Sequence, residues 1–469
     1  MSDKKKKLGL VIVDGVGYRN FVLSKFLEVS SDSFDEIVIY SGLKESVYDV
    51  SKYSNINIVE LEVYRENRKA EFWRKLNEIA HLFKHRSFFG MNDTLNFTKP
   101  KGYSKRSILN RCIRFIAAIF HSEKNMKFYQ KKVYKAFSQS VVTQNFIKIL
   151  TSDKPDILFF THQRPPYIAP LVYAANVNKI KTCSFIFSWD NLASKGRIPA
   201  MFDSFLVWSD LMKNELKYFY PSVDQSDICV VGTPQFEPYV MNEYQTSLSE
   251  FHSKLNLNST KKTICFSCGD LSTGRNDQLS ISIIADAIIE NKILQPVNLL
   301  VRTSPADDGS RFNSIKEKYP FIIWNTPKWV QTRKNHAEPW SQRLPLKEDI
   351  IELRSILEYS DLGINMCSTM SLDFMVFGKP VINQVLGNKE NGLFDDQRFL
   401  NYNHYKTVIE SGAVVLAKTA KELIIAINDS LENPIRTKNE QQEILNLEIS
   451  KPLKGTSDRI VNALFQLSE

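Results

Sequence analysis

The stretch FIFSWDNLASKG, residues 185–196, runs from apolar residues directly into side chains that can do chemistry. A buried strand has no use for an aspartate, an asparagine and a lysine placed at its end. Asp190 could take a proton from a hydroxyl group, a step that contributes typically about 10²–10⁴-fold to a rate. Trp189 could stack on a ligand ring, Asn191 could orient that ring and Lys195 could meet a phosphate group. We expect Asp190 to be a general base, with a loop cap and a core tryptophan as the alternative reading.

Two other apolar runs end in ionisable groups. His162 and Arg164 follow residues 156–161, and Asp14 follows residues 8–13. His162 is the rival of Asp190 for the role of base, and Asp14 is the third choice. Three such runs converging on one edge are harder to explain by chance than any one of them. The segment DGVGYRN adds groups that we expect at the same edge, although its glycines make an incomplete G-x-G-x-x-G pattern: Gly15, Gly17, Arg19 and Asn20.

The strongest pattern is NMCSTMSLDFMVFGKPVIN, residues 365–383. Ser368, Thr369 and Ser371 open a predicted short helix, whose first N–H groups and dipole can hold a phosphate. Asp373, one turn later, could accept hydrogen bonds from ribose hydroxyls. A simple helix cap by Ser368 is the alternative. Two further residues are candidate contacts of the same ligand, with an ion pair and a structural histidine as their alternatives: Arg302 and His404.

The elements that must position these residues alternate as strand, loop and helix. The first series of predicted strands covers residues 8–13, 36–40, 56–61, 156–161, 182–188, 204–208 and 228–231. A second series covers 263–268, 297–302, 321–324, 362–365, 380–383 and 413–416. Predicted helices between them include 166–178, 209–220, 277–291, 348–359 and 419–431. Short, nearly continuous apolar runs are typical of parallel strands buried on both faces.

This alternation predicts an α/β fold of two Rossmann-like, doubly wound domains facing a cleft. We expect the first domain over residues 1–240, with a basic helical insert at about 65–150, and the second over 258–450. The polar stretch near 238–258 is the predicted hinge. Residues 451–469 should form a helix that folds back on the first domain. Ligands of such sheets bind at the carboxyl ends of the strands, which is where the candidate residues lie.

The positive charge of the chain is concentrated in the insert. The whole chain has a net charge of +9, but residues 65–135 hold 18 Lys and Arg against 5 Asp and Glu. Aromatic residues are interleaved with these cations. An anionic membrane face or a lipid-linked acceptor would suit this composition, and a solvated helical hairpin is the alternative. No nucleic-acid recognition motif accompanies the charge, so we expect no nucleic-acid partner.

Metal and cofactor chemistry has no motif in this sequence. There is no D-x-D triplet, and Cys265 and Cys268 have no second ligand pair for zinc. We therefore expect no metal and no cofactor. The apolar run after MSDKKKK is too short and too interrupted for a signal peptide, and no apolar run approaches the roughly 20 residues that span a bilayer. We expect a cytoplasmic protein, with peripheral attachment to the inner face of the membrane left open.

Residues 365–383 resemble the C-terminal domains of GT-B glycosyltransferases and nucleotide-sugar 2-epimerases. The shared features are the small-residue helix start, the acid five positions before a glycine, and the following Pro-Val. The resemblance implies that Ser368 and Thr369 hold the donor pyrophosphate and that Asp373 holds the ribose. It is closest to bacterial enzymes that build surface polysaccharides, such as capsule or O-antigen, including relatives of CDP-glycerol glycerophosphotransferases.

Two departures from these families bear on the reaction. Retaining GT-B enzymes often have an acidic residue where this chain has Asn365, and this difference favours an inverting reaction. Glycerophosphotransferases often have histidine where this chain has Ser304, which weakens the polyol-phosphate reading. We therefore expect a metal-independent glycosyltransferase that moves a sugar from a nucleotide diphosphate to a surface-glycan or lipid-linked acceptor. A polyol-phosphate transferase on the same fold is the alternative.

Overall fold

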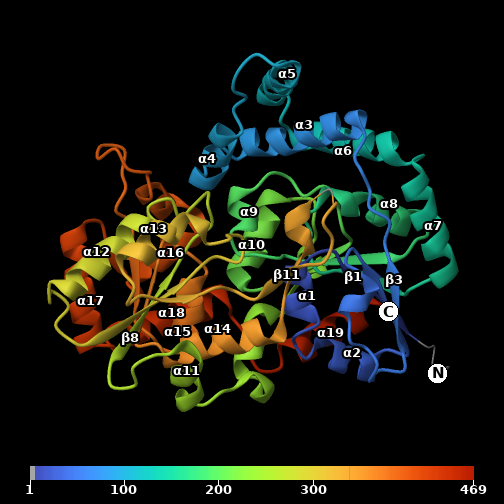
Figure 1. The fold of residues 1–469 in the computed structure, drawn as a ribbon. Helices are drawn as coiled ribbons and strands as arrows, with labels where there is room; N and C mark the ends of the chain where they lie inside the picture. The colour runs from blue at the N-terminus through green and yellow to red at the C-terminus, as the bar shows by residue number, and fades with distance from the viewer. Residues whose placement is uncertain (1–5, 337) are drawn as a thin grey trace. The chain divides into compact units, whose positions relative to one another are not determined.

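The computed structural model describes residues 6–336 and 338–469. The chain divides into two compact units. The N-terminal unit comprises Met1–Glu237, Gln331–Leu344 and Glu448–Glu469, and the C-terminal unit comprises Pro238–Val330 and Pro345–Leu447. Each unit contains a parallel sheet covered by helices (Figure 1). The fold class predicted from the alternation of strands and helices, two Rossmann-like α/β domains, is confirmed.

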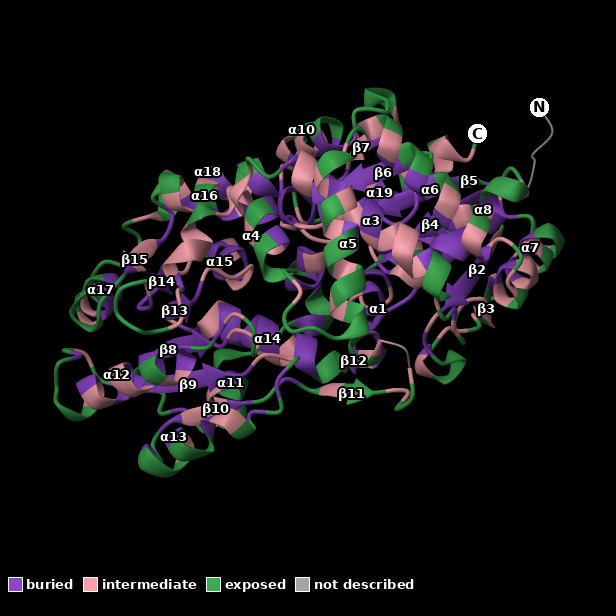
Figure 2. Ribbon diagram, turned by 90° about the horizontal axis from the view of Figure 1, so that it is seen from above, coloured by how far each residue is buried: buried purple, intermediate pink, exposed green. Residues whose placement is uncertain are grey.

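The sheet of the N-terminal unit has the order β3-β2-β1-β4-β5-β6-β7, with every neighbouring pair parallel. Its strands are β1 (Lys7–Ile12), β2 (Glu36–Ser41), β3 (Ile56–Glu60), β4 (Ile157–Phe160), β5 (Lys181–Phe185), β6 (Ser204–Val207) and β7 (Ile228–Val230). The central strands β1, β4 and β5 are buried except at their first residues Lys7 and Lys181, because helices cover both faces (Figure 2). The chain leaves β1 toward β2 and returns to its other side at β4, so the order reverses between β1 and β4.

Helices of two kinds surround this sheet. Those packed around the sheet are α1 (Gly15–Phe21), α2 (Phe26–Ser33), α7 (Val141–Asp153), α8 (Ala169–Val177), α9 (Asn191–Ser194), α10 (Asp210–Phe219) and α19 (Thr456–Leu467). Those of the basic insert are α3 (Arg68–Lys84), α4 (Phe89–Phe97), α5 (Lys105–Ile119) and α6 (Glu123–Phe137). Polar caps begin several of them; Ser209, for example, accepts a hydrogen bond from the Met212 amide at the start of α10.

The C-terminal unit repeats the same plan. Its sheet has the order β10-β9-β8-β13-β14-β15, again parallel. The strands are β8 (Lys262–Ser267), β9 (Val297–Arg302), β10 (Ile323–Asn325), β13 (Leu362–Asn365), β14 (Val381–Gln384) and β15 (Val415–Ala417). The helices are α11 (Leu248–Leu255), α12 (Asp277–Ile289), α13 (Asn313–Lys318), α14 (Lys347–Tyr359), α15 (Met370–Val376), α16 (Asn403–Ser411), α17 (Ala420–Glu432) and α18 (Lys438–Glu448). Here the order reverses between β8 and β13.

Two late segments of the chain belong to the N-terminal unit. Residues 331–344, between β11 (Trp329–Gln331) and β12 (Arg343–Pro345), pack with it. Arg333 forms an ion pair with Glu60 at 2.6 Å, and Gln342 donates a hydrogen bond to the Gly42 carbonyl. The helix α19 packs on α2, where the rings of Phe34 and Phe465 are 5.7 Å apart. Over the described residues, no helix has both the length and the apolar character of a membrane span.

Candidate functional site

Asp14 and His162 come together at the point where the strand order of the N-terminal sheet reverses. Because β1 pairs with β4, with Val11 opposite Phe160, the loops that follow the two strands are neighbours. The Asp14 side chain accepts a hydrogen bond from the Gly17 amide at 2.7 Å, which caps α1. Its second carboxylate oxygen lies 2.6 Å from Nδ1 of His162. Both side chains are buried, so the contact is shielded from water.

The His162 ring is held by aromatic neighbours as well as by Asp14. The ring of Phe187 stacks on it with centroids 4.0 Å apart, and Trp340 meets it edge-on at 6.2 Å. With Nδ1 directed at a carboxylate, Nε2 is the nitrogen that remains to accept a proton. A carboxylate that orients a histidine in this way is a general-base arrangement. Asp14 and His162 therefore form a pair suited to activating a hydroxyl group.

Asp190 is held mainly by its own loop. One of its carboxylate oxygens accepts hydrogen bonds from Ser188 Oγ at 2.6 Å and from Asn191 Nδ2 at 2.9 Å. The other lies 3.4 Å from Lys195 Nζ. Asn191 in turn accepts a hydrogen bond from Gln163, the residue after His162. The loops after β4 and β5 are thus joined, and the predicted residues of both lie at one edge of the sheet.

The remaining candidates of the N-terminal unit are buried or closely packed against other parts of the chain. A Cβ added to Gly15 would lie 1.7 Å from the Arg343 carbonyl oxygen, and one on Gly17 would lie 2.6 Å from Thr161 Oγ1. Both glycines therefore permit a close approach of the chain rather than a turn. Trp189 is buried. Arg19 and Asn20 are buried in α1. Arg164 donates a hydrogen bond to the Gly196 carbonyl at 3.0 Å.

Segment 331–344 completes the surroundings of His162 and could not be expected from its position in the sequence. Besides Trp340, it brings His336 edge-on to Tyr167 with ring centroids 5.9 Å apart. Burial raises the pKa of the Glu338 carboxyl above its ordinary value. Tyr167 donates a hydrogen bond to the Val13 carbonyl beside Asp14. The acid–imidazole pair thus sits among side chains from three distant parts of the chain.

A glycine-rich loop follows β8 in the C-terminal unit, where that sheet reverses its order. This loop, GDLSTGR over residues 269–275, was not among the predicted sites, although a Gly-Asp-x-Ser-Thr-Gly run after a strand is a recognisable signal. A Cβ on Gly274 would lie 2.9 Å from the Gly269 Cα, so the two ends of the loop are in contact. Arg311 donates to the Gly269 carbonyl at 2.8 Å, and Asp277 accepts a hydrogen bond from the Gly269 amide at 2.9 Å.

Carboxyl groups beneath this loop are perturbed by burial. Burial raises the pKa of Asp277 to about 7, against the attraction of Arg311 at 3.2 Å. Burial likewise raises the pKa of Asp396 to about 6, although Asn276 donates a hydrogen bond to it. Such groups can hold or release a proton near neutral pH. They lie under the edge at which ligands of open α/β sheets bind.

The loop after β13 holds the predicted donor residues. Cys367 has a φ of 46°, and the Ser368 amide donates to Asn365 Oδ1 at 3.0 Å. Ser368 Oγ in turn accepts a hydrogen bond from the Met370 amide at the start of α15, and Thr369 is the last residue before that helix. Ser371 is fully buried, and its hydroxyl forms hydrogen bonds with Asn365, Asn383 and Tyr405. Its hydroxyl therefore fixes the loop from below.

The other predicted donor-binding residues are Asp373, Arg302 and His404, and the structure shows the contacts of the first two and the position of the third. The Tyr239 hydroxyl donates to Asp373 Oδ1 at 2.5 Å, and Asp373 is buried. Arg302 is also buried and forms an ion pair with Asp349 at 2.8 Å, which neutralises its charge within the unit. His404 lies in the first turn of α16, half-buried.

Comparisons with known proteins bear on the fold. No family model matches this chain, and no curated protein matches it. UDP-N-acetylglucosamine 2-epimerase from Rickettsia bellii is 9% identical, with 99% of this chain and 97% of that chain covered and a TM-score of 0.51. A glycosyltransferase from Rickettsia africae is 12% identical, with 99% of each chain covered and a TM-score of 0.51. Arabidopsis thaliana UGT89C1, complexed with UDP-L-rhamnose, is 11% identical over the whole of both chains, with a TM-score of 0.52.

The chain has the GT-B fold.

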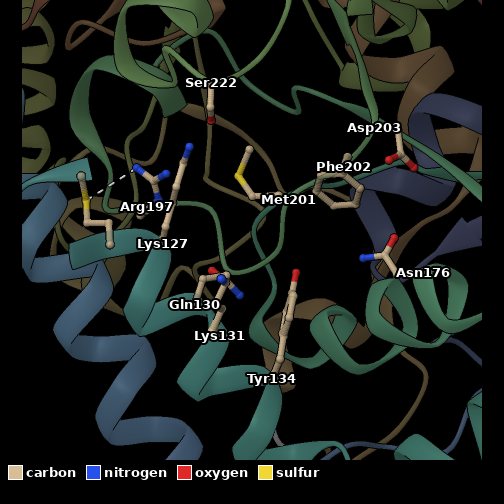
Figure 3. A pocket seen from close by; sticks show the side chains of 11 residues that line it. Lys127, Gln130, Lys131, Tyr134, Asn176, Arg197, Met201, Phe202, Asp203 and Ser222 are labelled. Carbon is tan, nitrogen blue, oxygen red and sulfur yellow. Dashed lines mark hydrogen bonds between the residues drawn. The ribbon is translucent and has the colours of Figure 1, made fainter. Parts of the chain in front are cut away.

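In this GT-B chain, one pocket in the described residues lies away from the predicted site residues. It has a volume of about 460 Å³ and lies between α6 and the segment before β6 (Figure 3). Lys127 and Tyr134 of α6 line it, together with Arg197, which also contacts the Met126 sulfur at 3.6 Å. Met201 and Asp203 place it at the amino end of β6, whereas Asp14 and His162 lie at the carboxyl edge. Among the described residues there is no group of three acidic, histidine or cysteine side chains that could hold a metal ion.

Proposed function

We propose that this protein is a glycosyltransferase that moves a sugar from a nucleotide-diphosphate donor to a hydroxyl group of a surface-glycan or lipid-linked acceptor, with inversion and without a metal. The observation that carries the proposal is the buried Asp14–His162 contact of 2.6 Å at the reversal point of the N-terminal sheet. The GT-B fold supports it, since solved structures of this fold include a glycosyltransferase and a protein complexed with UDP-L-rhamnose. The proposal moves the role of base from Asp190 to His162.

In the proposed reaction, Nε2 of His162 accepts the proton of the acceptor hydroxyl. The acceptor oxygen forms a bond to the anomeric carbon of the sugar while the bond from that carbon to the diphosphate oxygen breaks. The nucleoside diphosphate leaves with the bonding electron pair. Asp14 stabilises the imidazolium and keeps the ring in one orientation, which is how a carboxylate assists a histidine base. The rate gain from such a base is typically about 10²–10⁴-fold.

The donor site of this proposal is formed by the two loops at the reversal point of the C-terminal sheet, residues 269–275 and 366–369. Backbone amides and the hydroxyls of Ser368 and Thr369 would hold the diphosphate and stabilise its charge as it leaves. Asp373 would accept hydrogen bonds from the ribose. Ser371 would shape the second of these loops, because its hydroxyl is engaged within the unit. Arg302 would support the unit through its contacts with Asn325 and Asp349.

The acceptor side belongs to the N-terminal unit. Asn191 and Gln163 link the loops after β4 and β5, and Lys195 lies beside Asp190. In this proposal Asp190 and Lys195 together shape the acceptor site near the base. Trp189 would support that loop from the core, because it is buried.

A donor panel tests the proposed function. Purified protein is incubated with UDP-, GDP- and CDP-linked sugars and with CDP-glycerol, in the presence of a glycolipid extract as the acceptor source. We expect nucleoside diphosphate to be released from a nucleotide sugar only when the extract is present. Release of CMP from CDP-glycerol would instead favour the polyol-phosphate alternative. Interconversion of nucleotide sugars without an acceptor would show an epimerase and would contradict the proposal.

A further inference from the structure

The helix α5 of the basic insert has two separate apolar faces. On one face, Ile113 and Ala117 are buried in a core with residues of α3 and α6, among them Leu76 and Met126. α5 lies on the outer side of this helical layer (Figure 1). The packing of α5 is therefore satisfied by one face alone, and its second face needs another explanation.

The second apolar face of α5 is exposed. Ile108, Cys112, Phe115 and Ile119 follow the spacing i, i+4, i+7 and i+11, which places them on one line along a helix. Phe115 is 69% exposed and Ile119 is 54% exposed. Figure 2, which looks down on this side, shows exposed residues along α5. Other large exposed apolar side chains lie nearby in the chain: Phe97, Tyr103, Leu109 and Phe120.

A continuous exposed apolar stripe of this kind marks an interaction surface, whereas single exposed apolar residues do not. The charge around it indicates what it meets. Between Asp93 and Glu123 the sequence has six Lys and Arg residues and no acidic residue. Five of these cations are exposed: Lys99, Lys101, Lys105, Arg106 and Arg111. The surface is thus apolar along its centre and bordered mainly by cations, of which Arg106 also pairs with Glu71 of α3 at 3.6 Å.

We propose that residues 97–120 form a docking face for an anionic lipid bilayer, with α5 lying in the plane of the membrane surface. Apolar side chains on one face of a helix and cations beside them are the features of helices that bind at the headgroup level. The helix has 15 residues, a length of about 22 Å at 1.5 Å per residue. The cations would meet anionic headgroups, to which each Lys or Arg near the surface is attracted within about 10 Å at moderate salt.

A vesicle flotation assay tests this proposal with the full chain and no donor or acceptor. The vesicles are pure phosphatidylcholine or an equal mixture of phosphatidylcholine and phosphatidylglycerol. We expect binding to the anionic vesicles, weakened by salt, and little binding to the neutral ones. The double variant Phe115→Ser/Ile119→Ser should reduce binding roughly tenfold or more, because both side chains are exposed and would lose their burial in the membrane. The double variant Lys105→Glu/Arg111→Glu should reduce it comparably.

A matched control comes from the other unit. Leu294 is 78% exposed on the C-terminal unit, so Leu294→Ser changes an exposed apolar residue outside the proposed face. It should bind anionic vesicles as the wild type does. Thermal unfolding of every variant should match the wild type, which shows that the fold is intact. Wild-type binding by Phe115→Ser/Ile119→Ser, or no vesicle binding by the wild-type protein at low salt, would overturn the proposal.

Cys112 allows a second and independent readout. It lies on the proposed face and is exposed, whereas the other five cysteines are buried or half-buried. A polarity-sensitive fluorophore attached to Cys112 should shift to shorter wavelength with anionic vesicles and remain unchanged with neutral ones. Vesicle binding without a spectral shift would place the contact elsewhere and overturn the proposal. So would sedimentation velocity showing a dimer that the Phe115→Ser/Ile119→Ser variant abolishes, with vesicle binding unaffected, because the face would then meet a second copy.

The proposed membrane contact is independent of the proposed reaction. The flotation assay needs neither nucleotide nor turnover, and neither Phe115 nor Ile119 is among the residues assigned to sugar transfer. If flotation fails, the proposal for the Asp14–His162 pair still stands. If the donor panel fails, the docking face still stands.

Discussion

At the scale of single residues, His162 and Asp190 differ as candidate general bases in their hydrogen-bonding partners rather than in residue type. Each is an ionisable side chain at the carboxyl end of a strand, and the sequence alone favours Asp190. The structure gives Asp190 local partners in Ser188, Asn191 and Lys195, and gives His162 a carboxylate from a residue 148 positions away. Such a long-range pair could be expected only once β1 and β4 were known to be neighbours.

Asp373 and Tyr239 provide a prediction about the donor site. Asp373→Ala should weaken the binding of UDP by about 0.5–1.5 kcal/mol, the usual net worth of one hydrogen bond, because ribose hydroxyls lose their acceptor. Tyr239→Phe removes the hydroxyl that Asp373 accepts from but keeps the carboxylate, so it should bind UDP at least as well as the wild type. Titration calorimetry measures both. Equal UDP affinity in Asp373→Ala and the wild type would remove Asp373 from the donor site.

The buried carboxyl group of Asp277 predicts a dependence of stability on pH. An aspartate in the unfolded chain has a pKa of about 3.9, whereas burial raises the pKa of Asp277 to about 7 in the folded state. The folded state therefore binds this proton more tightly, and stability falls as the pH rises from about 4 to about 7. Asp277→Asn cannot ionise. The melting temperature of the variant minus that of the wild type should therefore grow between about pH 4 and pH 7.

Asp270, in the loop just before α12, is the matched control. Its pKa is lowered because hydrogen bonds from Ser272 and Thr273 outweigh the effect of its burial. Its stabilising contribution is therefore present at neutral pH and is lost as the pH falls. The melting temperature of Asp270→Asn minus that of the wild type should become more negative as the pH rises. Parallel trends in the two variants would contradict the assigned pKa of Asp277.

At the scale of elements, short apolar runs made the strands predictable. All thirteen predicted strands are present in the described residues, most within one or two residues at each end, because parallel strands buried on both faces leave a continuous apolar signal. The predicted strand 182–188 ends at Phe185, where Ile186–Ser188 continue as a loop toward Asp190. The loop 269–275 was not predicted as a site, because only Cys265 and Cys268 of the preceding strand were considered as candidate residues there.

Segment 331–344 shows what local patterns cannot predict. Its residues lie between two predicted elements of the second series, yet they pack in the N-terminal unit. The contacts that place it, such as Arg333 with Glu60 and Gln342 with Gly42, join residues about 270 to 300 positions apart. Neither periodicity nor composition carries information about such partners. The edge-on contact of Trp340 with the His162 ring could therefore not be predicted from the sequence.

Gly15 tests how this segment is held. A Cβ at Gly15 would lie 1.7 Å from the Arg343 carbonyl oxygen, which forces the backbone of the segment away. Gly15→Ala should therefore expose Arg333 and Lys334 to trypsin and raise the rate of cleavage there. Val16→Ala, at the next position of the same helix, is the control and should be cleaved as slowly as the wild type. An unchanged cleavage rate in Gly15→Ala would show that the segment is not held by this contact.

At the scale of the whole molecule, the GT-B fold predicts a response to nucleotides. A ligand that binds only the folded state stabilises it by RT ln(1 + [L]/Kd), about 2.7 kcal/mol at a hundredfold excess over Kd. We expect one nucleoside diphosphate among UDP, GDP and CDP to raise the melting temperature of the full chain, with UDP as the first probe. Single-stranded RNA should leave it unchanged. A shift with RNA and none with any nucleotide would contradict a donor site in this fold.

The central claim is that His162, oriented by Asp14, takes the proton from the acceptor in sugar transfer. The measurement that tests it most directly is the single-turnover rate at saturating donor for His162→Ala, Asp14→Asn and Asp190→Asn, with the donor Kd determined beside each. We expect a loss of roughly 10²–10⁴-fold for His162→Ala, a clear loss for Asp14→Asn, and a rate within a few fold of wild type for Asp190→Asn, all with unchanged donor Kd. Near-wild-type turnover in His162→Ala, with collapse in Asp190→Asn, would contradict it and return the role of base to Asp190.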